Sequence, residues 1–322
     1  MIRIGIVGYG NVGKGAAKAV KAASDMELKA IFTRRDPGSI KTAENNIAVL
    51  PIEAAGTMVD DIDVMLLCGG SATDLPEQGP YFASMFNTVD SYDNHAKIPD
   101  YMESINAVIK NKTAIISTGW DPGPFSMMRL LFESVLPSGT TYTFWGKGVS
   151  QGHSNAIRRI EGVKDAVQYT VPIDSAVNKV RAGETPVLEP GQRMMRECYV
   201  VAESGADKTE IEKAIKTMPH YFAGYETTVT FIDEAELNEN HYKMPHGGMV
   251  LRSGNTGEND HVMEFSLKLE SNPEFTASII VSYARAAYRM ASEGLYGAKT
   301  VFDVPLYYLS DKDRLSLIKD LL

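Results

Sequence analysis

The residues with the clearest chemical meaning are six positions near the start of the chain, with glycines in a G-x-G-x-x-G spacing. They follow the apolar run Ile2–Val7, precede a helical pattern, and are Gly8, Tyr9, Gly10, Asn11, Val12 and Gly13. In such a loop the glycines permit a tight turn, close approach of the backbone to a pyrophosphate, and close packing of helix on strand. The helix N-terminus offers N–H groups to the phosphates. A glycine-rich turn without ligand is the alternative, and the strand–loop–helix context favours a dinucleotide site.

The end of the next apolar run, Leu28–Thr33, indicates which dinucleotide binds. The run closes on Thr33, Arg34 and Arg35. A site for NAD usually has an acid here, which bonds the ribose 2′-hydroxyl. Two guanidinium groups and a hydroxyl suit a 2′-phosphate instead, which predicts NADP. A solvated basic turn, with Asp36 as the ribose-binding acid, is the alternative.

A second glycine-rich segment follows the apolar run Val64–Cys68. It contains Gly70, Ser71, Ala72 and Thr73, which we expect at the carboxyl edge of the sheet, where such folds bind ligands. Ser71 or Thr73 could equally cap the helix that follows. Both interpretations can hold together.

Two acids follow later strands of the same half. Asp93 and Asp121 come after the apolar runs at 88–91 and 114–117, so both should face the nicotinamide end of a bound cofactor. An aspartate in a turn is more often a turn former or a cap. His241 and His246 are metal ligands by type, but they have no helix-spaced partner and no Cys/His cluster, so we predict no metal site.

Alternating short apolar runs and helical patterns position these residues. The expected strands of the first 120 residues are Ile2–Val7, Leu28–Thr33, Val64–Cys68, Thr88–Ser91 and Ala114–Ser117, and Val12–Ala23 is an expected helix. This alternation predicts right-handed crossovers and a doubly wound parallel (Rossmann) sheet. The segment Asp36–Pro51 is expected to be largely loop.

Beyond residue 124 the pattern changes to strand-like runs separated by turns and few helices. The runs are Thr141–Trp145, Val167–Val171, Glu197–Val201, Glu226–Ile232 and His261–Leu269. The sequence therefore predicts an α/β protein whose second domain is α+β and mostly antiparallel. A helix at Phe275–Ser292 is expected to pack back on the N-terminal sheet.

Composition narrows the class of protein. The chain has 322 residues and a formal net charge of −9, which disfavours a nucleic-acid partner and an anionic membrane surface. Its two cysteines, Cys68 and Cys198, form no disulfide framework, so a reducing cytoplasm is expected. Ile4–Val7 is too short for a signal-peptide core, and no stretch approaches the roughly 18 apolar residues of a membrane span.

Several longer motifs, in order along nearly the whole chain, resemble the meso-diaminopimelate dehydrogenase family. They are Val-Gly-Tyr-Gly-Asn at 7–11, Tyr-Asp-Asn-His at 92–95, Ser-Thr-Gly-Trp-Asp-Pro-Gly at 117–123, Thr-Phe-Trp-Gly at 143–146, Ser-Gln-Gly-His-Ser at 150–154, Ala-Val-Gln-Tyr-Thr at 166–170, Met-Pro-His-Gly-Gly at 244–248 and Leu-Lys-Leu-Glu-Ser-Asn-Pro-Glu-Phe-Thr-Ala-Ser at 267–278. The resemblance implies NADP-dependent, reversible oxidative deamination of the D-centre of meso-2,6-diaminopimelate, and a homodimer. It suggests a dinucleotide-binding domain at 1–120, completed by 270–322, and a substrate-binding and dimerisation domain at 121–269.

The resemblance also implies roles for individual residues. Asp93 and Asp121 would lie near the reacting amino group; the pocket would be lined by Trp145, Gln151 and Gly152, and the distal L-centre held by Thr170, Arg196, His246 and Asn272. Two positions depart from the family pattern. Lys97 stands where some relatives have an acid and is given no role, and Thr33 replaces an expected serine but keeps its hydroxyl.

This chemistry is consistent with these residue types. The substrate carries two carboxylates and two ammonium groups, and buried charges must be paired. A carboxylate near the reacting amine can orient it, accept its proton or stabilise the iminium that forms. Whether Asp93, Asp121 or a water takes the proton is left open.

Two other classes of protein share this layout. One is another NADP oxidoreductase, such as an opine-type or a semialdehyde dehydrogenase. The latter needs a nucleophilic cysteine in the second domain, where Cys198 is the only candidate and lies inside an expected strand. The other is a cofactor-sensing protein that kept the dinucleotide site, which would not need charged anchors between residues 93 and 272.

Overall fold

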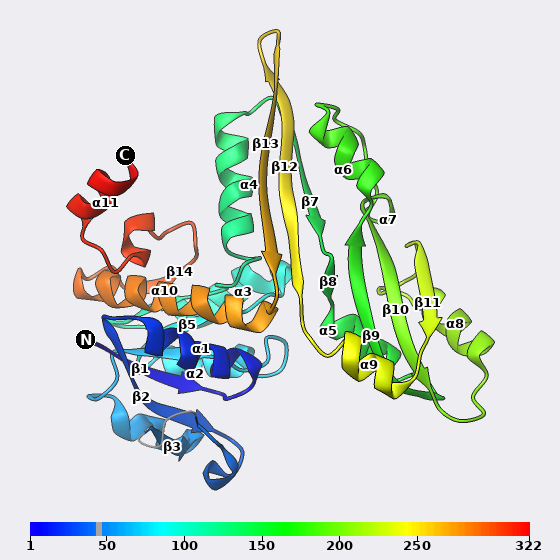
Figure 1. Cartoon of the computed structure of the whole chain (residues 1–322). Helices are drawn as coiled ribbons and strands as arrows, with labels where there is room; N and C mark the ends of the chain where they lie inside the picture. Colours follow the sequence, from blue (N-terminus) through cyan, green and yellow to red (C-terminus); the bar gives the residue numbers. More distant parts are fainter. Residues whose placement is uncertain (43–46) are drawn as a thin grey trace. The chain divides into compact units, whose positions relative to one another are not determined.

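The computed structural model describes residues 1–42 and 47–322, which form two compact units. The first unit comprises Met1–Met127 and Pro273–Leu322, and the second comprises Met128–Asn272. Each unit contains its own β-sheets, as Figure 1 shows. Helix α4 (Pro124–Val135) contains the first of the two chain boundaries between them.

The first unit is built on a seven-stranded parallel sheet. The strands are β1 (Ile2–Val7), β2 (Met26–Thr33), β3 (Ala48–Pro51), β4 (Val64–Leu67), β5 (Asn87–Asp90), β6 (Thr113–Ile115) and β14 (Gly297–Lys299). Their order is β3-β2-β1-β4-β5-β6-β14, and every neighbouring pair is parallel. This confirms the doubly wound sheet expected from the sequence. The strand order reverses between β1 and β4, which is the switch point at which such folds bind ligands.

The first unit also contains five helices among its described residues. They are α1 (Asn11–Ala22), α2 (Leu75–Ala83), α3 (Ile98–Asn106), α10 (Asn272–Ser292) and α11 (Arg314–Leu321). Phe82 of α2 and Tyr101 of α3 share one apolar core with Phe32 and Met65 of the sheet. Helix α10, expected from the sequence at Phe275–Ser292, runs beside α1 (Figure 1), and a Cβ on Gly15 would lie 2.9 Å from the Cβ of Ala277.

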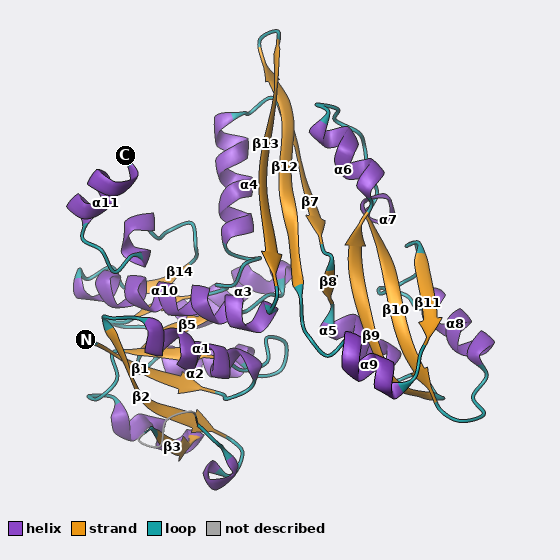
Figure 2. Cartoon of the chain, viewed as in Figure 1, coloured by secondary structure: helices purple, strands orange, loops and turns teal. Residues whose placement is uncertain are grey.

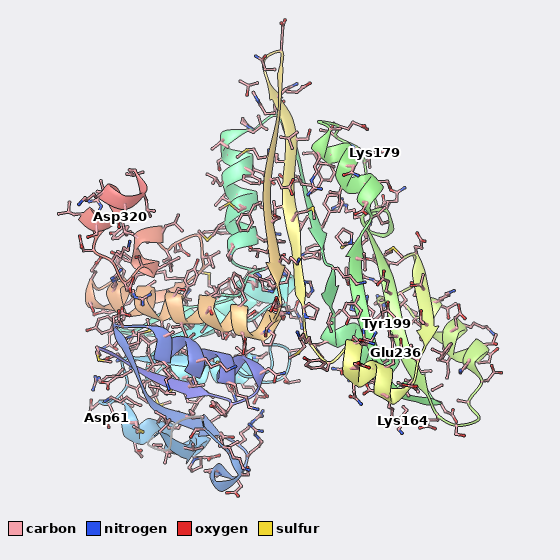
Figure 3. All side chains as sticks on the ribbon, viewed as in Figure 1. Asp61, Lys164, Lys179, Tyr199, Glu236 and Asp320 are labelled. Carbon is pink, nitrogen blue, oxygen red and sulfur yellow. The ribbon has the colours of Figure 1, made fainter. Side chains whose placement is uncertain are left out.

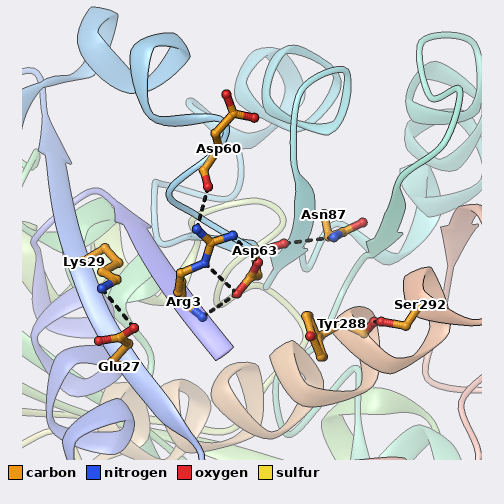
Figure 4. A network of polar contacts seen from close by, with 8 residues as sticks. All are labelled: Arg3, Glu27, Lys29, Asp60, Asp63, Asn87, Tyr288 and Ser292. Atoms are coloured by element: carbon orange, nitrogen blue, oxygen red, sulfur yellow. Dashed lines mark hydrogen bonds and ion pairs between the residues drawn. The ribbon is translucent and has the colours of Figure 1, made fainter. Parts of the chain in front are cut away.

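A polar network holds the amino edge of the sheet (Figure 4). Arg3 at the start of β1 forms an ion pair of 2.7 Å with Asp63, the residue before β4. The amide of Asn87 at the start of β5 donates to the Asp63 carbonyl at 2.9 Å. These contacts join three central strands at the edge opposite to their carboxyl ends.

The second unit contains a four-stranded sheet, β11-β10-β9-β8, and a three-stranded sheet, β13-β12-β7. The strands are β7 (Gly139–Trp145), β8 (Gly148–Val149), β9 (Val163–Pro172), β10 (Met194–Ala202), β11 (Thr227–Phe231), β12 (His246–Thr256) and β13 (Asn259–Leu269), and the helices are α5 (Gln151–Ile157), α6 (Asp174–Arg181), α7 (Pro190–Arg193), α8 (Lys208–Lys216) and α9 (Glu234–Asn240). All strand pairs are antiparallel except β10–β11, so the mostly antiparallel prediction is confirmed (Figure 2).

Aromatic contacts hold α9 against the four-stranded sheet. Tyr199 of β10 stacks on the ring of His241, which follows α9, with ring centroids 4.1 Å apart. The hydroxyl of Tyr169 on β9 lies 3.0 Å from Nδ1 of the same histidine. Figure 3 labels Tyr199 and, on α9, Glu236. His241 thus has a packing role.

Two expectations about elements are wrong. Asp36–Pro51 is not largely loop, because its described part contains a 3₁₀ turn at Pro37–Ser39 and the edge strand β3; residues 43–46 lie outside the described chain. The second unit has five helices among its described residues rather than few. Met244–Gly248 leads into β12, where a Cβ on Gly248 would lie 2.3 Å from the carbonyl oxygen of Phe144. Glycine at 248 therefore permits close approach of two strands.

Candidate functional site

The glycine-rich loop after β1 has the geometry that a pyrophosphate requires. Gly8 has a φ of +89°, a conformation that favours glycine, and a Cβ on Gly13 would lie 2.1 Å from the Gly8 carbonyl oxygen. Around Gly10, by contrast, no described atom lies within 4 Å of the position a Cβ would occupy. Gly10 is also the N-cap of α1 and has no side chain to bond the first-turn N–H groups. The loop is therefore closely packed at Gly13 and open at Gly10, where the helix N-terminus begins.

The basic residues after β2 are held by other parts of the same loop region. The Arg34 guanidinium forms an ion pair of 2.8 Å with Asp74, and the Arg35 guanidinium donates to the Tyr9 carbonyl at 2.8 Å. Thr33 Oγ1 accepts the backbone N–H of Arg35 at 3.1 Å. Asp36 accepts the N–H of Gly38 at the start of the 3₁₀ turn, which is a capping role. The two arginines are thus oriented before any ligand binds.

The loop after β4 joins the expected cofactor site to Asp93. Ser71 Oγ donates to the Asp93 carboxylate at 2.5 Å and accepts the Asp93 backbone N–H at 2.9 Å. The N-cap of α2 is Asp74, so the alternative in which Ser71 or Thr73 caps that helix is wrong. Asp74 also accepts the N–H of Gly70 at 2.8 Å. Gly70, Ser71, Ala72 and Thr73 therefore all lie in the loop itself.

Asp121 lies in a closed turn after β6. The Gly119 N–H donates to the Pro122 carbonyl at 2.7 Å, and the Phe125 N–H donates to the Trp120 carbonyl at 3.1 Å. Both of these contacts join backbone atoms.

Asp90, the last residue of β5, received no role from its sequence. It is completely buried, and its carboxylate accepts three hydrogen bonds, from the backbone N–H groups of Tyr92 and Ser117 and from the Tyr101 hydroxyl. Burial raises the pKa of Asp90 above its usual range, while these donors lower it. This carboxylate therefore joins the loop after β5 to the loop after β6, which only the folded structure shows.

In the second unit the four expected distal residues lie on segments that contact one another. Gly148 of β8 pairs with Thr170 of β9, and Thr170 pairs with Arg196 of β10. A Cβ on Gly148 would lie 2.4 Å from Cγ of His246, so the histidine ring occupies the space that this glycine leaves open. The Asn272 N–H donates to the Met244 carbonyl at 2.9 Å, two residues before His246.

Arg196 is the buried cation of this group. It is 6% exposed, and its guanidinium donates to Thr170 Oγ1 at 2.5 Å and lies 4.1 Å from the centre of the Tyr225 ring. Burial lowers the pKa of Arg196 from its ordinary value. No Asp or Glu of the described chain forms an ion pair with it, and its Nε has no hydrogen-bond partner there. The neighbouring Glu197 pairs with Lys147 at 2.6 Å and not with Arg196.

The expected pocket residues occupy two adjoining segments of the second unit. Trp145 ends β7 and is partly buried, while Gln151 and Gly152 open α5 and are exposed. The Ser150 N–H before this helix donates to the Gln168 carbonyl at 3.0 Å. Helix α5 is thereby tied to β9, two residues from Thr170.

Two polar side chains near Arg196, one buried and one half-buried, were not predicted. Gln168 is completely buried, and neither polar atom of its amide has a partner in the described chain. His153 lies 2.6 Å from Ser150 Oγ through Nδ1 and packs edge-on against Tyr221 and Phe222. Burial, aided by the Arg196 charge, lowers the pKa of His153 to about 4.

The His153 shift predicts how stability depends on pH. The pKa of His153 is lowered from 6.5 to about 4 on folding. Between pH 4 and pH 6.5 the histidine is therefore protonated in the unfolded chain but largely neutral in the native chain. The free energy of unfolding should therefore fall as the pH drops through this window, by at most about 3 kcal/mol. Urea unfolding of the parent and of His153→Gln at several pH values tests this. Parallel curves for the two proteins would contradict it.

The chain is similar over its whole length to proteins of known function. Residues 119–271 match the family model described as the diaminopimelic acid dehydrogenase C-terminal domain. The meso-diaminopimelate D-dehydrogenase of Ureibacillus thermosphaericus is 61% identical over 100% of this chain and 99% of its own length. The chain belongs to the meso-diaminopimelate D-dehydrogenase family. The Corynebacterium glutamicum member is 48% identical over 98% of both chains.

Solved structures of this family agree in fold. The Corynebacterium glutamicum DAP dehydrogenase in complex with DAP has a TM-score of 0.90 at 46% identity, covering 100% of this chain and 99% of that one. An engineered D-amino acid dehydrogenase bound to NADP+ has a TM-score of 0.86 at 45% identity over the same shares. A six-substitution mutant of the Clostridium tetani E88 meso-DAP dehydrogenase, with DAP, has a TM-score of 0.94 at 55% identity, and each chain is covered completely.

Residues 1–42 and 47–322 contain neither a membrane-spanning helix nor a cluster of metal-ligating side chains. No helix in these ranges is both long enough and apolar enough to cross a bilayer. Nor do these ranges contain a group of three or more His, Cys, Asp or Glu side chains arranged to hold a metal ion.

Proposed function

We propose that this chain is an NADP-dependent oxidoreductase that deaminates the D-centre of meso-2,6-diaminopimelate, reversibly, to L-2-amino-6-oxopimelate and ammonia. One structural observation supports this substrate independently of family membership. Arg196 is a buried cation with no carboxylate partner in the described chain. A buried charge is costly until an anion pairs with it. The distal carboxylate of a diamino dicarboxylate supplies that anion.

The residues around Gly10 and Arg34 fit NADP. The space above Gly10 admits a pyrophosphate, and Arg34 with Arg35 suits the 2′-phosphate of the ribose. The family member of known structure that binds NADP+ supports the same assignment. When bound, NADP accepts the hydride from the D-carbon of the substrate.

Replacing Arg34 and Arg35 together by alanine should raise the KM for NADP by about 10- to 100-fold, because each charge-assisted hydrogen bond is worth about 1.5–3 kcal/mol. The KM for NAD should change far less, since NAD has no 2′-phosphate. Initial rates with both cofactors measure the ratio. An unchanged NADP/NAD preference would refute the assignment, and Lys312→Ala, which removes a surface cation that pairs with Asp320, serves as the control.

Asp93 and Asp121 are proposed to act on the reacting amine. The lone pair of a neutral amine drives hydride loss from the carbon, and a nearby carboxylate can take the proton that the ammonium form carries. The second carboxylate, which stays ionised, can stabilise the positive iminium, to which water adds before ammonia leaves. Ser71 supports this role for Asp93 by orienting both its carboxylate and its backbone N–H.

The distal L-centre is proposed to bind Thr170, Arg196, His246 and Asn272, with Trp145, Gln151 and Gly152 lining the pocket. The links among β8, β9, β10 and the start of β12 support this grouping. The Clostridium tetani protein of known structure carries substitutions of Gln, Thr, Arg, Pro, His and Asn in that chain order. The same types occur in the same order here at Gln151, Thr170, Arg196, Pro245, His246 and Asn272.

The decisive experiment is to incubate the purified protein with NADP and each diaminopimelate isomer and to follow reduced nicotinamide. The meso isomer should react and the LL isomer should not, because only the former offers a D-centre together with an L-centre. Absence of reaction with the meso isomer, or equal rates with all isomers, would overturn the proposal. A semialdehyde dehydrogenase is disfavoured by Cys198, which is buried and whose thiol pKa burial raises to about 12.

A homodimer in the cytoplasm is part of the same proposal. The family resemblance supports the dimer, and the sequence supports the location, with its two buried, unbridged cysteines. Sedimentation equilibrium tests the dimer directly, and a monomer at micromolar concentration would contradict it.

A further inference from the structure

The buried carboxylate of Asp90 connects the two loops that carry the candidate catalytic acids. Asp90 ends β5, is completely buried, and forms no ion pair with any described Lys, Arg or His. A buried acid without a cation is costly, so its hydrogen bonds must explain why an acid occupies this place.

Those hydrogen bonds reach into both loops. Oδ1 accepts the N–H of Tyr92 at 3.0 Å and the N–H of Ser117 at 2.9 Å. Oδ2 accepts the Tyr101 hydroxyl at 2.8 Å, and the Tyr101 ring stacks on that of Tyr92 with centroids 4.3 Å apart. The Asp90 carbonyl accepts the N–H of Thr118 at 2.7 Å and its hydroxyl at 2.8 Å.

These contacts lie immediately before the two acids. Tyr92 precedes Asp93 in the loop after β5, and Ser117 and Thr118 lead into the closed turn that carries Asp121. Ser117 has a φ of +57°, a left-handed conformation that is strained for a residue with a side chain. The bond from its N–H to Asp90 opposes relaxation of that conformation.

We propose that Asp90 is a positioning residue for the deamination, because its carboxylate sets the spacing between the Asp93 loop and the Asp121 loop. This inference rests on the proposed function of the two acids. Geometry rather than charge is the requirement. An asparagine at 90 can still accept both N–H groups through its oxygen, and its amide can donate to the Tyr101 oxygen.

The test compares three substitutions of Asp90. Asp90→Ala removes the junction and should lower kcat by about 10- to 100-fold, the scale expected for a small displacement of catalytic groups. Asp90→Asn keeps the geometry and should retain most of kcat. Asp90→Glu keeps the charge but displaces the acceptor, so it should behave like the alanine variant. The Kd for NADP, measured by fluorescence titration, should not change in any of them.

Asp63→Ala is the matched control. It breaks the Arg3 ion pair at the opposite edge of the same sheet (Figure 4) and should lower the melting temperature without lowering kcat. Hydrogen exchange of peptides covering residues 91–95 and 116–122 gives a readout independent of activity. Both peptides should exchange faster in Asp90→Ala and at the parental rate in Asp90→Asn.

The results separate this inference from the proposed function. A parent without activity on meso-diaminopimelate overturns the function itself. If the parent is active, two outcomes overturn only the positioning role. One is an Asp90→Ala variant that keeps the parental kcat, and the other is an Asp90→Asn variant whose kcat falls as far as that of Asp90→Ala. If Asp90→Ala does not fold, Tyr101→Phe removes one donor alone. Its kcat should fall at unchanged Kd for NADP, and an unchanged kcat would count against the inference.

Discussion

Replacing Arg196 by methionine is expected to weaken diaminopimelate binding by about 3–5 kcal/mol, or roughly 150-fold to 4,000-fold in Kd. The distal carboxylate would then be buried without a partner, which is the cause of the loss. Activity on a small D-amino acid without a distal carboxylate, where the parent shows any, should fall much less. Steady-state kinetics on both substrates measures the difference.

The same substitution should not destabilise the ligand-free protein. Arg196 pays a desolvation cost that its bonds to Thr170 and Tyr225 only partly offset, so methionine should leave the melting temperature unchanged or raise it. A residue kept for structure would behave in the opposite way. Loss of binding together with preserved stability is therefore the signature of a ligand anchor.

Arg252 provides the contrasting control within the same unit. It is also buried, but its guanidinium donates to the carbonyls of Leu136 and Pro137 and to the hydroxyl of Thr141 at 2.6–3.0 Å. Arg252→Met leaves two carbonyls without donors and should destabilise the protein by about 1–3 kcal/mol for each. Two results for Arg196→Met would contradict the anchor hypothesis. One is an equal loss of activity on both substrates, and the other is a melting temperature that falls as far as that of Arg252→Met.

The parallel sheet was predictable because its signals are local. Strands buried on both faces are continuous apolar runs, and Ile2–Val7 matches β1 without error. The loop after it needs glycine for steric reasons that act within six residues, as the contact between Gly13 and the Gly8 carbonyl shows. Helix α1 differs from its expected bounds by one residue at each end.

The missed strands lack such local signals. Strand β3 has four residues at the sheet edge and β14 has three, so neither is long enough to show a period. Strand β12 begins His-Gly-Gly, a sequence typical of turns, and its glycines are explained only by strands that approach from β7 and β13. Contacts distant in sequence decide all three cases.

The candidate site divides in the same way. Asp93 and Asp121 were predictable, because they follow strands whose carboxyl ends share one edge of the sheet. Asp90, Gln168 and His153 were not, since what distinguishes them is burial, and a sequence does not show which polar residue of a cluster faces inward. Arg196 lies between these cases. The family resemblance indicated a role for Arg196, and the structure showed that no described acid pairs with it.

Asp121→Asn is expected to lower kcat by about 10²- to 10⁴-fold with little effect on NADP binding. Asparagine keeps the shape of the side chain and removes the charge that takes the proton or stabilises the iminium. The turn should survive, because the bonds that close it join the backbones of Gly119 and Pro122 and of Trp120 and Phe125. Single-turnover kinetics with saturating NADP isolates the chemical step, and Asp303→Asn, an exposed acid in a turn with Thr300, is the control.

Asp93→Asn, measured beside it, separates the roles of the two acids. One oxygen of the Asp93 carboxylate already accepts the Ser71 hydroxyl at 2.5 Å, so this oxygen is engaged by the protein itself. We therefore expect Asp93→Asn to cost less than Asp121→Asn, and Ser71→Ala to reproduce part of the Asp93 loss. A larger loss at Asp93 would transfer the proton-accepting role to it. A loss of less than about threefold at Asp121, well below the range for a general base, would leave Asp121 with a purely structural role in its turn.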